Sequence, residues 1–398
     1  MMPFLHCFKG GDHQSPACNH SSTYAMAGRM LEWVLRLLHY ILVAVVGRLH
    51  KFFRWCPSSR QCLDDAERRL LSYMNKPYRG LFVDVGKIGD NSQRSSRIWT
   101  LVLEADDGCN DNLPLVLVHG YLCGSALWLL NLESLSKHRR VYSIDMLGFG
   151  KSSRPSFSTD ARVTERLLVQ GLEAWRKKIG LEKFVLLGHS MGGFVAAAYA
   201  LQHPQHVVHL VMEDPWGFTE CGVHKSPLRW VPWLVDIFTR GIKFFSRADI
   251  CTLLRAGGIL GPPLLAVALS HEIQMFSKIV PDKTAVPSYF YHCNVRRPSG
   301  EAAVKALMHQ FPWARHPMGP RVVDLPASIA ITFIYGENSF MGKHPAFKIM
   351  EARAPSSVSI HVIRGCGHNL HYEKPGKFND AVQKACQRAD AQERTISA

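Results

Sequence analysis

The stretch Leu187-Gly188-His189-Ser190-Met191-Gly192-Gly193 places a serine in a G-x-S-x-G pattern. A strand-like apolar run at 184–187 precedes it, and a helix-compatible apolar run at 194–201 follows it. Small residues on both sides of the serine let the chain turn sharply from strand to helix, which leaves the serine oxygen exposed on a strained elbow. In this context the pattern predicts that Ser190 is a nucleophile.

Apolar runs of strand length recur on both sides of this elbow and alternate with amphipathic helical sequence. Continuous apolar strands separated by helices are typical of a mainly parallel sheet that is buried on both faces. We therefore predict an α/β fold with a mainly parallel sheet and helices on both faces. The predicted strands are 115–118, 141–144, 184–187, 209–212, 331–335 and 358–363.

A serine hydroxyl is a weak nucleophile and needs a neighbouring base. Around an elbow of this kind the chain order is nucleophile, acid, histidine. His368 follows the last predicted strand in Gly365-Cys366-Gly367-His368, so we expect it to be the base. His371 lies in the same loop and is the alternative.

The acid that orients the histidine has two candidates. Its usual place is the loop after the strand at 331–335, which contains Glu337 but no aspartate. Another known place is the end of the preceding core strand, where Val211-Met212-Glu213-Asp214-Pro215 offers Asp214. The acid holds the imidazole in its productive tautomer, so its identity governs activity. We favour Asp214 slightly and keep Glu337 as the alternative.

Two backbone N–H groups are expected to form an oxyanion hole. Met191 supplies one, directly after the nucleophile, and the loop opened by Val118-His119-Gly120-Tyr121 supplies the other. On that loop the donor is Tyr121 or Leu122. Each such donor contributes about 3–4 kcal/mol to lowering the barrier.

Composition and charge narrow the class of partner. The chain has 398 residues and a net charge of +15, which favours an acidic partner. Its basic residues accompany apolar helices, so an anionic membrane fits better than nucleic acid, and we expect no nucleic-acid partner. The 11 cysteines form no C-x-x-C pairs and no metal-like spacing. We therefore expect an intracellular, reducing location, no metal and no cofactor.

Residues 30–55 read MLEWVLRLLHYILVAVVGRLHKFFRW. Glu32, Arg36 and His39 interrupt the apolar run and share one narrow helical stripe, and a basic segment follows. We predict a basic helix that lies in a membrane interface as a peripheral or monotopic anchor. A spanning helix and a helix packed on the protein's own core remain as alternatives.

The interval between Phe218 and Leu325, which separates the predicted strands at 209–212 and 331–335, breaks the alternation. It is rich in proline and arginine, has few strand signals, and has the position and size of an inserted helical cap. Its stretch at 228–245 mixes aromatic and basic residues and is a candidate lid. The expected division is 1–28 (disordered), 29–60 (membrane-associating), 61–218 (core), 219–325 (cap), 326–388 (core) and 389–398 (tail).

With these motifs placed, the chain resembles a subfamily of α/β-hydrolases that contains the N-acyl-phosphatidylethanolamine lysophospholipase and the adipose triglyceride lipase coactivator. The likeness covers residues 55–385, and Ser190 matches the hydrolytic branch, because the coactivator branch has asparagine there. The segments that carry it are Trp55-Cys56-Pro57, Ile144-Asp145-Met146-Leu147-Gly148-Phe149-Gly150-Lys151-Ser152-Ser153-Arg154-Pro155, Asp214-Pro215-Trp216-Gly217-Phe218, Tyr291-His292-Cys293-Asn294, Pro298-Ser299-Gly300-Glu301 and Trp313-Ala314-Arg315.

The resemblance implies a membrane-associated serine lipase that deacylates phospholipids, lysophospholipids or N-acyl phosphatidylethanolamines. The family also carries a histidine followed by an aspartate, cited as an acyltransferase motif; here the match is His368 with Glu373, a departure from aspartate. Glu373 precedes Lys374-Pro375, which is typical of a helix start. Two alternatives therefore stay open: a lysophosphatidic acid acyltransferase, and a non-enzymatic lipase regulator. The implied partners are a lipid substrate, a membrane or lipid-droplet surface at the endoplasmic reticulum, droplet or mitochondrion, and a lipase or droplet protein.

Overall fold

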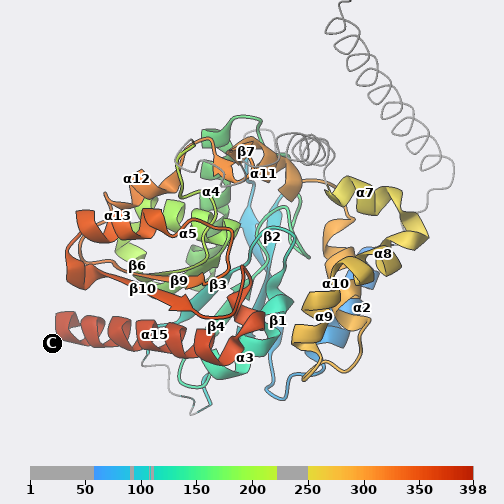
Figure 1. The fold of residues 1–398 in the computed structure, drawn as a ribbon, viewed down its shortest axis with the longest axis horizontal. Helices are drawn as coiled ribbons and strands as arrows, with labels where there is room; N and C mark the ends of the chain where they lie inside the picture. The colour runs from blue at the N-terminus through green and yellow to red at the C-terminus, as the bar shows by residue number, and fades with distance from the viewer. Residues whose placement is uncertain (1–57, 90–93, 107, 109–111, 222–249, 398) are drawn as a thin grey trace, which may run out of the picture. The chain divides into compact units, whose positions relative to one another are not determined.

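One mixed sheet organises the protein in a computed structural model that describes residues 58–89, 94–106, 108, 112–221 and 250–397. Its strand order is β1-β2-β4-β3-β5-β6-β9-β10 (Figure 1). β1 and β2 pair antiparallel, as do β2 and β4, whereas the remaining neighbours are parallel. The strands are β1 (Arg79–Gly86), β2 (Ser96–Leu103), β3 (Leu115–Val118), β4 (Val141–Ile144), β5 (Phe184–His189), β6 (Val207–Glu213), β9 (Ala330–Gly336) and β10 (Val358–Ile363).

The predicted α/β class and mainly parallel sheet are confirmed. Every residue of β3, β4, β5, β6 and β9 is buried, because helices cover both faces of the sheet. That burial explains why these strands read as continuous apolar runs without alternation. β5 carries the elbow at its end and lies between β3 and β6, in the middle of the sheet.

Helices pack on the two faces over separate apolar clusters. One cluster joins the sheet to α4 (Ala161–Ile179), α5 (Met191–Gln202), α12 (Met318–Val322) and α13 (His344–Ala352). The other joins it to α3 (Leu129–Leu135) and α15 (Pro375–Ser397). α4 shows why such a segment is helical: the Asp160 side chain accepts a hydrogen bond from the Val163 N–H at its start, and Gly180 ends it in the left-handed conformation.

The inserted segment between β6 and β9 is mainly helical where it is described. α10 packs against α2 (Arg60–Leu71), and with α9 it covers an apolar cluster at the β2 side of the sheet (Figure 1). A small hairpin, β7 with β8, adds strand structure that the sequence did not indicate. The segment contains α7 (Ile250–Ala256), a 3-10 turn (Gly258–Leu260), α8 (Gly261–Ala268), α9 (Ser270–Phe276), α10 (Ala285–Asn294), α11 (Gly300–Leu307), β7 (Met308–Gln310) and β8 (Trp313–Ala314).

Several expectations fall outside the described residues. They are the N-terminal tail at 1–28, almost all of the membrane-associating segment at 29–60, and the candidate lid at 228–245. Within the part of the chain that is described, no helix combines the length and the apolar character needed to cross a bilayer.

Candidate active site

The sharp turn at Ser190 begins α5 directly after β5. Ser190 has φ 52° and ψ −117°, a strained conformation for a residue with a Cβ. Its N–H donates to the Glu213 carbonyl (2.9 Å) at the end of β6, and its carbonyl accepts from the Trp216 N–H (3.0 Å) in the segment that follows β6. Gly192 is required here, because a Cβ at that position would lie 2.3 Å from the Val118 carbonyl oxygen. The glycine of the G-x-S-x-G pattern, which helped to predict the turn, is thus also the residue that makes the turn sterically possible.

Three side chains from distant parts of the chain form a continuous hydrogen-bonded line. The Ser190 hydroxyl lies 3.0 Å from His368 Nε2, and His368 Nδ1 lies 2.5 Å from Asp214 Oδ2. Because a carboxylate can only accept, the imidazole donates from Nδ1, which leaves Nε2 free to accept the serine proton. This is the arrangement of a nucleophile, a base and an orienting acid.

Asp214 is fully buried and is held by its surroundings. Its residue has φ 42°, and its N–H donates to the Ile334 carbonyl (2.8 Å). The Ser339 hydroxyl donates to the same carboxylate oxygen that contacts His368. Burial raises the pKa of Asp214 above its usual range, while the hydrogen bond from His368 opposes that change. The carboxylate is therefore fixed in place to orient and balance the imidazole.

The alternative acid, Glu337, lies elsewhere in the loop after β9. Its side chain is exposed, and Oε2 accepts the N–H of Gly365 at 3.0 Å. This contact ties the β9 loop to the loop that carries His368. Of the two candidates left open by the sequence, the structure brings Asp214, and not Glu337, to the imidazole.

The expected oxyanion donors lie on both sides of Ser190. Met191 is the first residue of α5, where backbone N–H groups have no acceptor within the helix. In the loop after β3, Leu122 has a positive φ of 64°, and Tyr121 packs its ring edge-on against Phe149. The Asn294 side chain, from α10, donates to the Leu122 carbonyl at 2.8 Å. A residue of the inserted segment thus fixes the loop that is expected to supply the second donor.

A second carboxylate–histidine pair lies behind the first. His371 is buried, and both its N–H and its Nδ1 lie 2.8 Å from Glu213 Oε1. Burial lowers the pKa of His371 to about 3 and raises that of Glu213 to about 7. His371, the alternative base, is thus engaged with Glu213, while His368 contacts Ser190.

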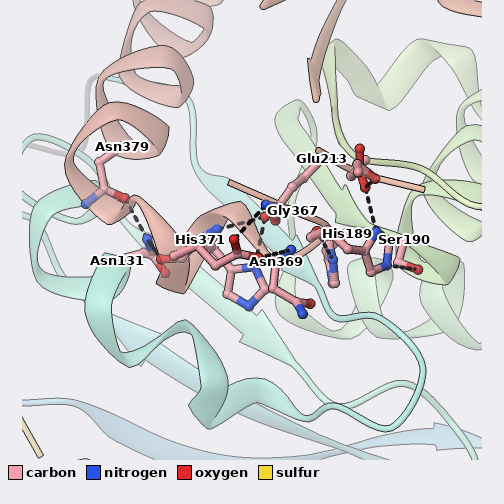
Figure 2. A network of polar contacts seen from close by, with 12 residues as sticks. Asn131, His189, Ser190, Glu213, Gly367, Asn369, His371 and Asn379 are labelled. Atoms are coloured by element: carbon pink, nitrogen blue, oxygen red, sulfur yellow. Dashed lines mark hydrogen bonds and ion pairs between the residues drawn. The ribbon is translucent and has the colours of Figure 1, made fainter. Parts of the chain in front are cut away.

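Further polar contacts extend this buried network (Figure 2). His189 donates from Nε2 to the His368 carbonyl (3.1 Å), and burial lowers its pKa to about 3. Figure 2 shows Asn131 between Asn379 and His371; its amide donates to the Asn379 side chain (2.9 Å) and to the His371 carbonyl (2.8 Å). The network therefore fixes the His368 loop through neutral imidazoles and amides.

Among the described residues, His189, Glu213 and His371 are the one group whose ligand atoms cluster as a metal site would require, all within 4.8 Å. Two observations favour hydrogen bonding over metal binding. Glu213 already accepts from His371, and a Cβ on Gly120 would lie 2.6 Å from His189 Nδ1, so the free nitrogen of that ring faces the backbone closely. We assign the trio to the buried network.

Glu373 contacts the His368 loop through both carboxylate oxygens. Oε2 accepts the Gly367 N–H at 2.6 Å, and Oε1 accepts the Asn369 N–H at 3.0 Å. The carboxylate therefore spans the two residues that flank His368. The expected helix start is present, since α15 begins at Pro375, but Glu373 ends the short helix α14 (Leu370–Glu373) instead.

Comparison with known proteins places this geometry in a family. The sequence profile of the alpha/beta hydrolase fold matches residues 114–375, which contain the whole hydrogen-bonded line. The chain belongs to the alpha/beta hydrolase family. A human relative of this hydrolase, "(Lyso)-N-acylphosphatidylethanolamine lipase", is 34% identical over 84% of this chain and 94% of its own length. A mouse relative, "1-acylglycerol-3-phosphate O-acyltransferase ABHD5", is 36% identical over 84% of this chain and 91% of its own.

Solved structures agree on the fold of this hydrolase. Carboxylesterase CesB from Bacillus subtilis aligns over 81% of this chain and 96% of its own, with a TM-score of 0.54 and 16% identity. A bacterial membrane phospholipase A aligns over 93% and 99%, with a TM-score of 0.53 and 17% identity. The resemblance to the subfamily and the expected fold are both confirmed.

Sequence reasoning did not single out the parts of the site that lie behind its reacting groups. Glu213 precedes Asp214 directly, and an adjacent pair of acids at the end of a buried strand was the available signal. His189 lies within the elbow motif itself. Asn294 belongs to a segment quoted only for its family likeness, with no role attached.

Proposed function

We propose that this hydrolase is a serine lipase that deacylates phospholipids, lysophospholipids or N-acyl phosphatidylethanolamines. The observation that carries the proposal is the unbroken line from the Ser190 hydroxyl through His368 to Asp214. Relatives named as a lipase and as an acyltransferase of glycerolipids supply the substrate class. A purely regulatory protein needs no hydrogen-bonded nucleophile, base and acid, so the hypothesis of a non-enzymatic regulator comes second.

In the proposed reaction Ser190 Oγ attacks the ester carbonyl while His368 Nε2 takes the hydroxyl proton. The oxyanion receives hydrogen bonds from Met191 N–H and from the loop at Tyr121 or Leu122. His368 returns the proton to the leaving lysophospholipid or glycerol oxygen, which leaves an acyl-serine. Water then attacks this ester, His368 takes the water proton and returns it to the serine oxygen, and the fatty acid is released.

Exposed aromatic side chains beside the imidazole support a lipid substrate. The Phe340 ring is 58% exposed and lies 4.8 Å from the His368 ring, centroid to centroid. Phe311, in the turn between β7 and β8, is 51% exposed and lies 6.0 Å from Phe340. Large exposed apolar groups favour contact with apolar ligands, and Phe340 presents one directly beside the imidazole.

The test is fatty-acid release from a panel of N-acyl, lyso- and diacyl-phospholipids by wild-type protein, Ser190→Ala and the control Ser277→Ala, which alters an exposed serine. We expect release by wild type and control, and none above background from Ser190→Ala. The preferred lipid then names the substrate. Equal release by all three proteins would contradict the proposal, as would the absence of release from a folded wild type.

In the alternative acyltransferase reaction the same acyl-serine forms, but its acyl group passes to lysophosphatidic acid in place of water. The mouse relative's name favours it as a second activity, as does Glu373, whose carboxylate holds the backbone on both sides of His368. Incubation with lysophosphatidic acid and acyl-CoA should then give phosphatidic acid that depends on Ser190 and His368. Product that persists in Ser190→Ala would rule this route out.

Membrane association belongs to the proposal as well. We place the protein intracellularly, on a membrane or lipid-droplet surface, through the segment at 29–60 and with a lipase or droplet protein as a partner. A protein that lacks residues 1–60 should lose co-sedimentation with membranes. Retained co-sedimentation would move membrane contact to the inserted segment.

A further inference from the structure

A second polar region lies apart from the reacting groups. A cavity of about 970 Å³ opens beside β1 and β2, and is also lined by the 151–158 loop, α4 and residues 296–297 (Figure 1 locates these elements). Six arginines, Lys151 and six serines line it, and no aspartate or glutamate does so in the described part of the chain. Ser190, His368 and Asp214 are not among its lining residues.

One of these cations is already neutralised. The buried Lys151 ammonium forms ion pairs with Asp64 (2.9 Å) and Glu67 (3.0 Å) behind the cavity wall. Burial raises the pKa of Glu67 to about 8. Lys151 therefore belongs to an internal cluster and contributes little attraction for an added anion.

The arginines at the cavity are different. Arg60, Arg97 and Arg297 are exposed, and none of them forms an ion pair with the described residues. The guanidinium carbons of Arg60 and Arg97 lie 4.6 Å and 5.1 Å from the centre of the same ring, Phe82. This ring holds two like charges close together, although they repel each other.

Arg154 adds a half-buried positive charge to the same wall. Its guanidinium donates to the carbonyls of Gly148 (2.7 Å) and Cys293 (2.8 Å), while its buried Nε has no hydrogen-bond partner among the residues that the structure describes. Burial and the neighbouring Arg296 lower the pKa of Arg154 to about 10. Glu301 and Asp145, the carboxylates that stabilise its charge, are not among the residues that line the cavity, so the lining itself carries positive charge.

We propose that this cavity binds a phosphate-bearing anion. Guanidinium groups match phosphate with paired N–H donors, and serine hydroxyls add further donors to its oxygens. The volume lies in the range of small-molecule sites, which accommodates a phosphorylated head group rather than a single ion. Several arginines around one space favour a ligand with more than one negative charge over a single carboxylate.

The phosphate can be carried by a lipid head group or by a soluble ester, and the experiment separates these sources. Full-length wild type is compared with the triple variant Arg60→Gln/Arg97→Gln/Arg297→Gln. The control variant Arg364→Gln/Lys377→Gln/Lys384→Gln removes the same charge from a cavity of about 410 Å³ beside β10, at the opposite edge of the sheet. Circular dichroism and thermal melting establish that each protein is folded.

Two probes are used: inositol trisphosphate in solution, and phosphatidylcholine vesicles that contain phosphatidylinositol bisphosphate. We expect wild type and control to bind, and the cavity variant to lose about tenfold or more in affinity. Loss of affinity for both probes supports a phosphate site that recognises the head group without a bilayer. Loss with vesicles only supports a site for phosphate presented on a bilayer. Equal weakening of both variants, or no binding of either probe by wild type, would overturn the proposal.

Discussion

Two carboxylate–histidine pairs lie side by side in this hydrolase, and only one of them contacts the serine. Their acids are consecutive residues, Glu213 and Asp214, and their histidines are three residues apart, His368 in the loop after β10 and His371 in α14. The His368 side chain is 17% exposed, whereas that of His371 is 2% exposed. The same pair of residue types therefore reacts in one place and forms a buried structural hydrogen bond in the other. The difference follows from solvent exposure of the imidazole and from its contact with Ser190.

The largest expected effect tests this division directly. His368→Gln should lower kcat by about 10⁴-fold or more, because it removes the base that contacts the Ser190 hydroxyl. His371→Gln should change kcat of the folded protein less than about tenfold, but lower the free energy of unfolding by about 1–3 kcal/mol through loss of a buried hydrogen bond. Ester hydrolysis and chemical denaturation measure the two effects. If both variants lost activity equally, the two pairs would act as one unit.

The acids should show the same contrast at a smaller scale. Asp214→Asn should lower kcat by about 10³–10⁴-fold with KM little changed, since the amide favours the wrong imidazole tautomer. Glu337→Gln is the matched control and should stay within about twofold of wild type, because its exposed carboxylate accepts the Gly365 N–H and lies away from the imidazole. Steady-state kinetics on one ester decides between them. A large loss of activity in Glu337→Gln would instead identify Glu337 as the acid.

The buried pair should also reveal itself through pH. Folding raises the pKa of Glu213 from 4.5 to about 7, so the folded state holds this proton more tightly than the unfolded state. The stability contributed by this group is complete below pH 4.5 and is lost as pH rises through about 7. Both wild type and Glu213→Gln contain the buried histidines, so subtracting their unfolding curves isolates Glu213. The difference should favour the variant increasingly up to about pH 7; a flat difference would show that the pKa of Glu213 is not raised.

Glu373 should give the smallest effect, as a positioning residue. Glu373→Gln replaces one acceptor oxygen with a donor, so one of the two N–H contacts around His368 is lost. We expect a fall in kcat of about three- to tenfold, with KM nearly constant. Glu373→Asp tests reach, because the shorter side chain is less able to span both N–H groups. Wild-type kcat in both variants would assign Glu373 to helix structure alone.

The fold and the elbow were predictable because their determinants are local. A glycine on each side of Ser190 and apolar runs of strand length are visible in the sequence itself. For the acid the sequence supported only a slight preference for Asp214 over Glu337, because the choice depends on sheet order: β6 lies between β5 and β9, so Asp214 reaches the same edge of the sheet as Ser190. Likewise, nothing local distinguishes His371 from His368; burial against Glu213 does so.

The contact between Asn294 and the Leu122 carbonyl joins the inserted segment to the loop beside the nucleophile. Free energy shared across such a contact is reciprocal: whatever shifts α10 alters the loop, and whatever occupies the loop stabilises α10 by the same amount. A ligand that binds against the oxyanion donors should therefore slow amide exchange in α10, at a distance from the bond being cleaved. The position of α10 and the binding of a ligand at the oxyanion loop are thus thermodynamically coupled.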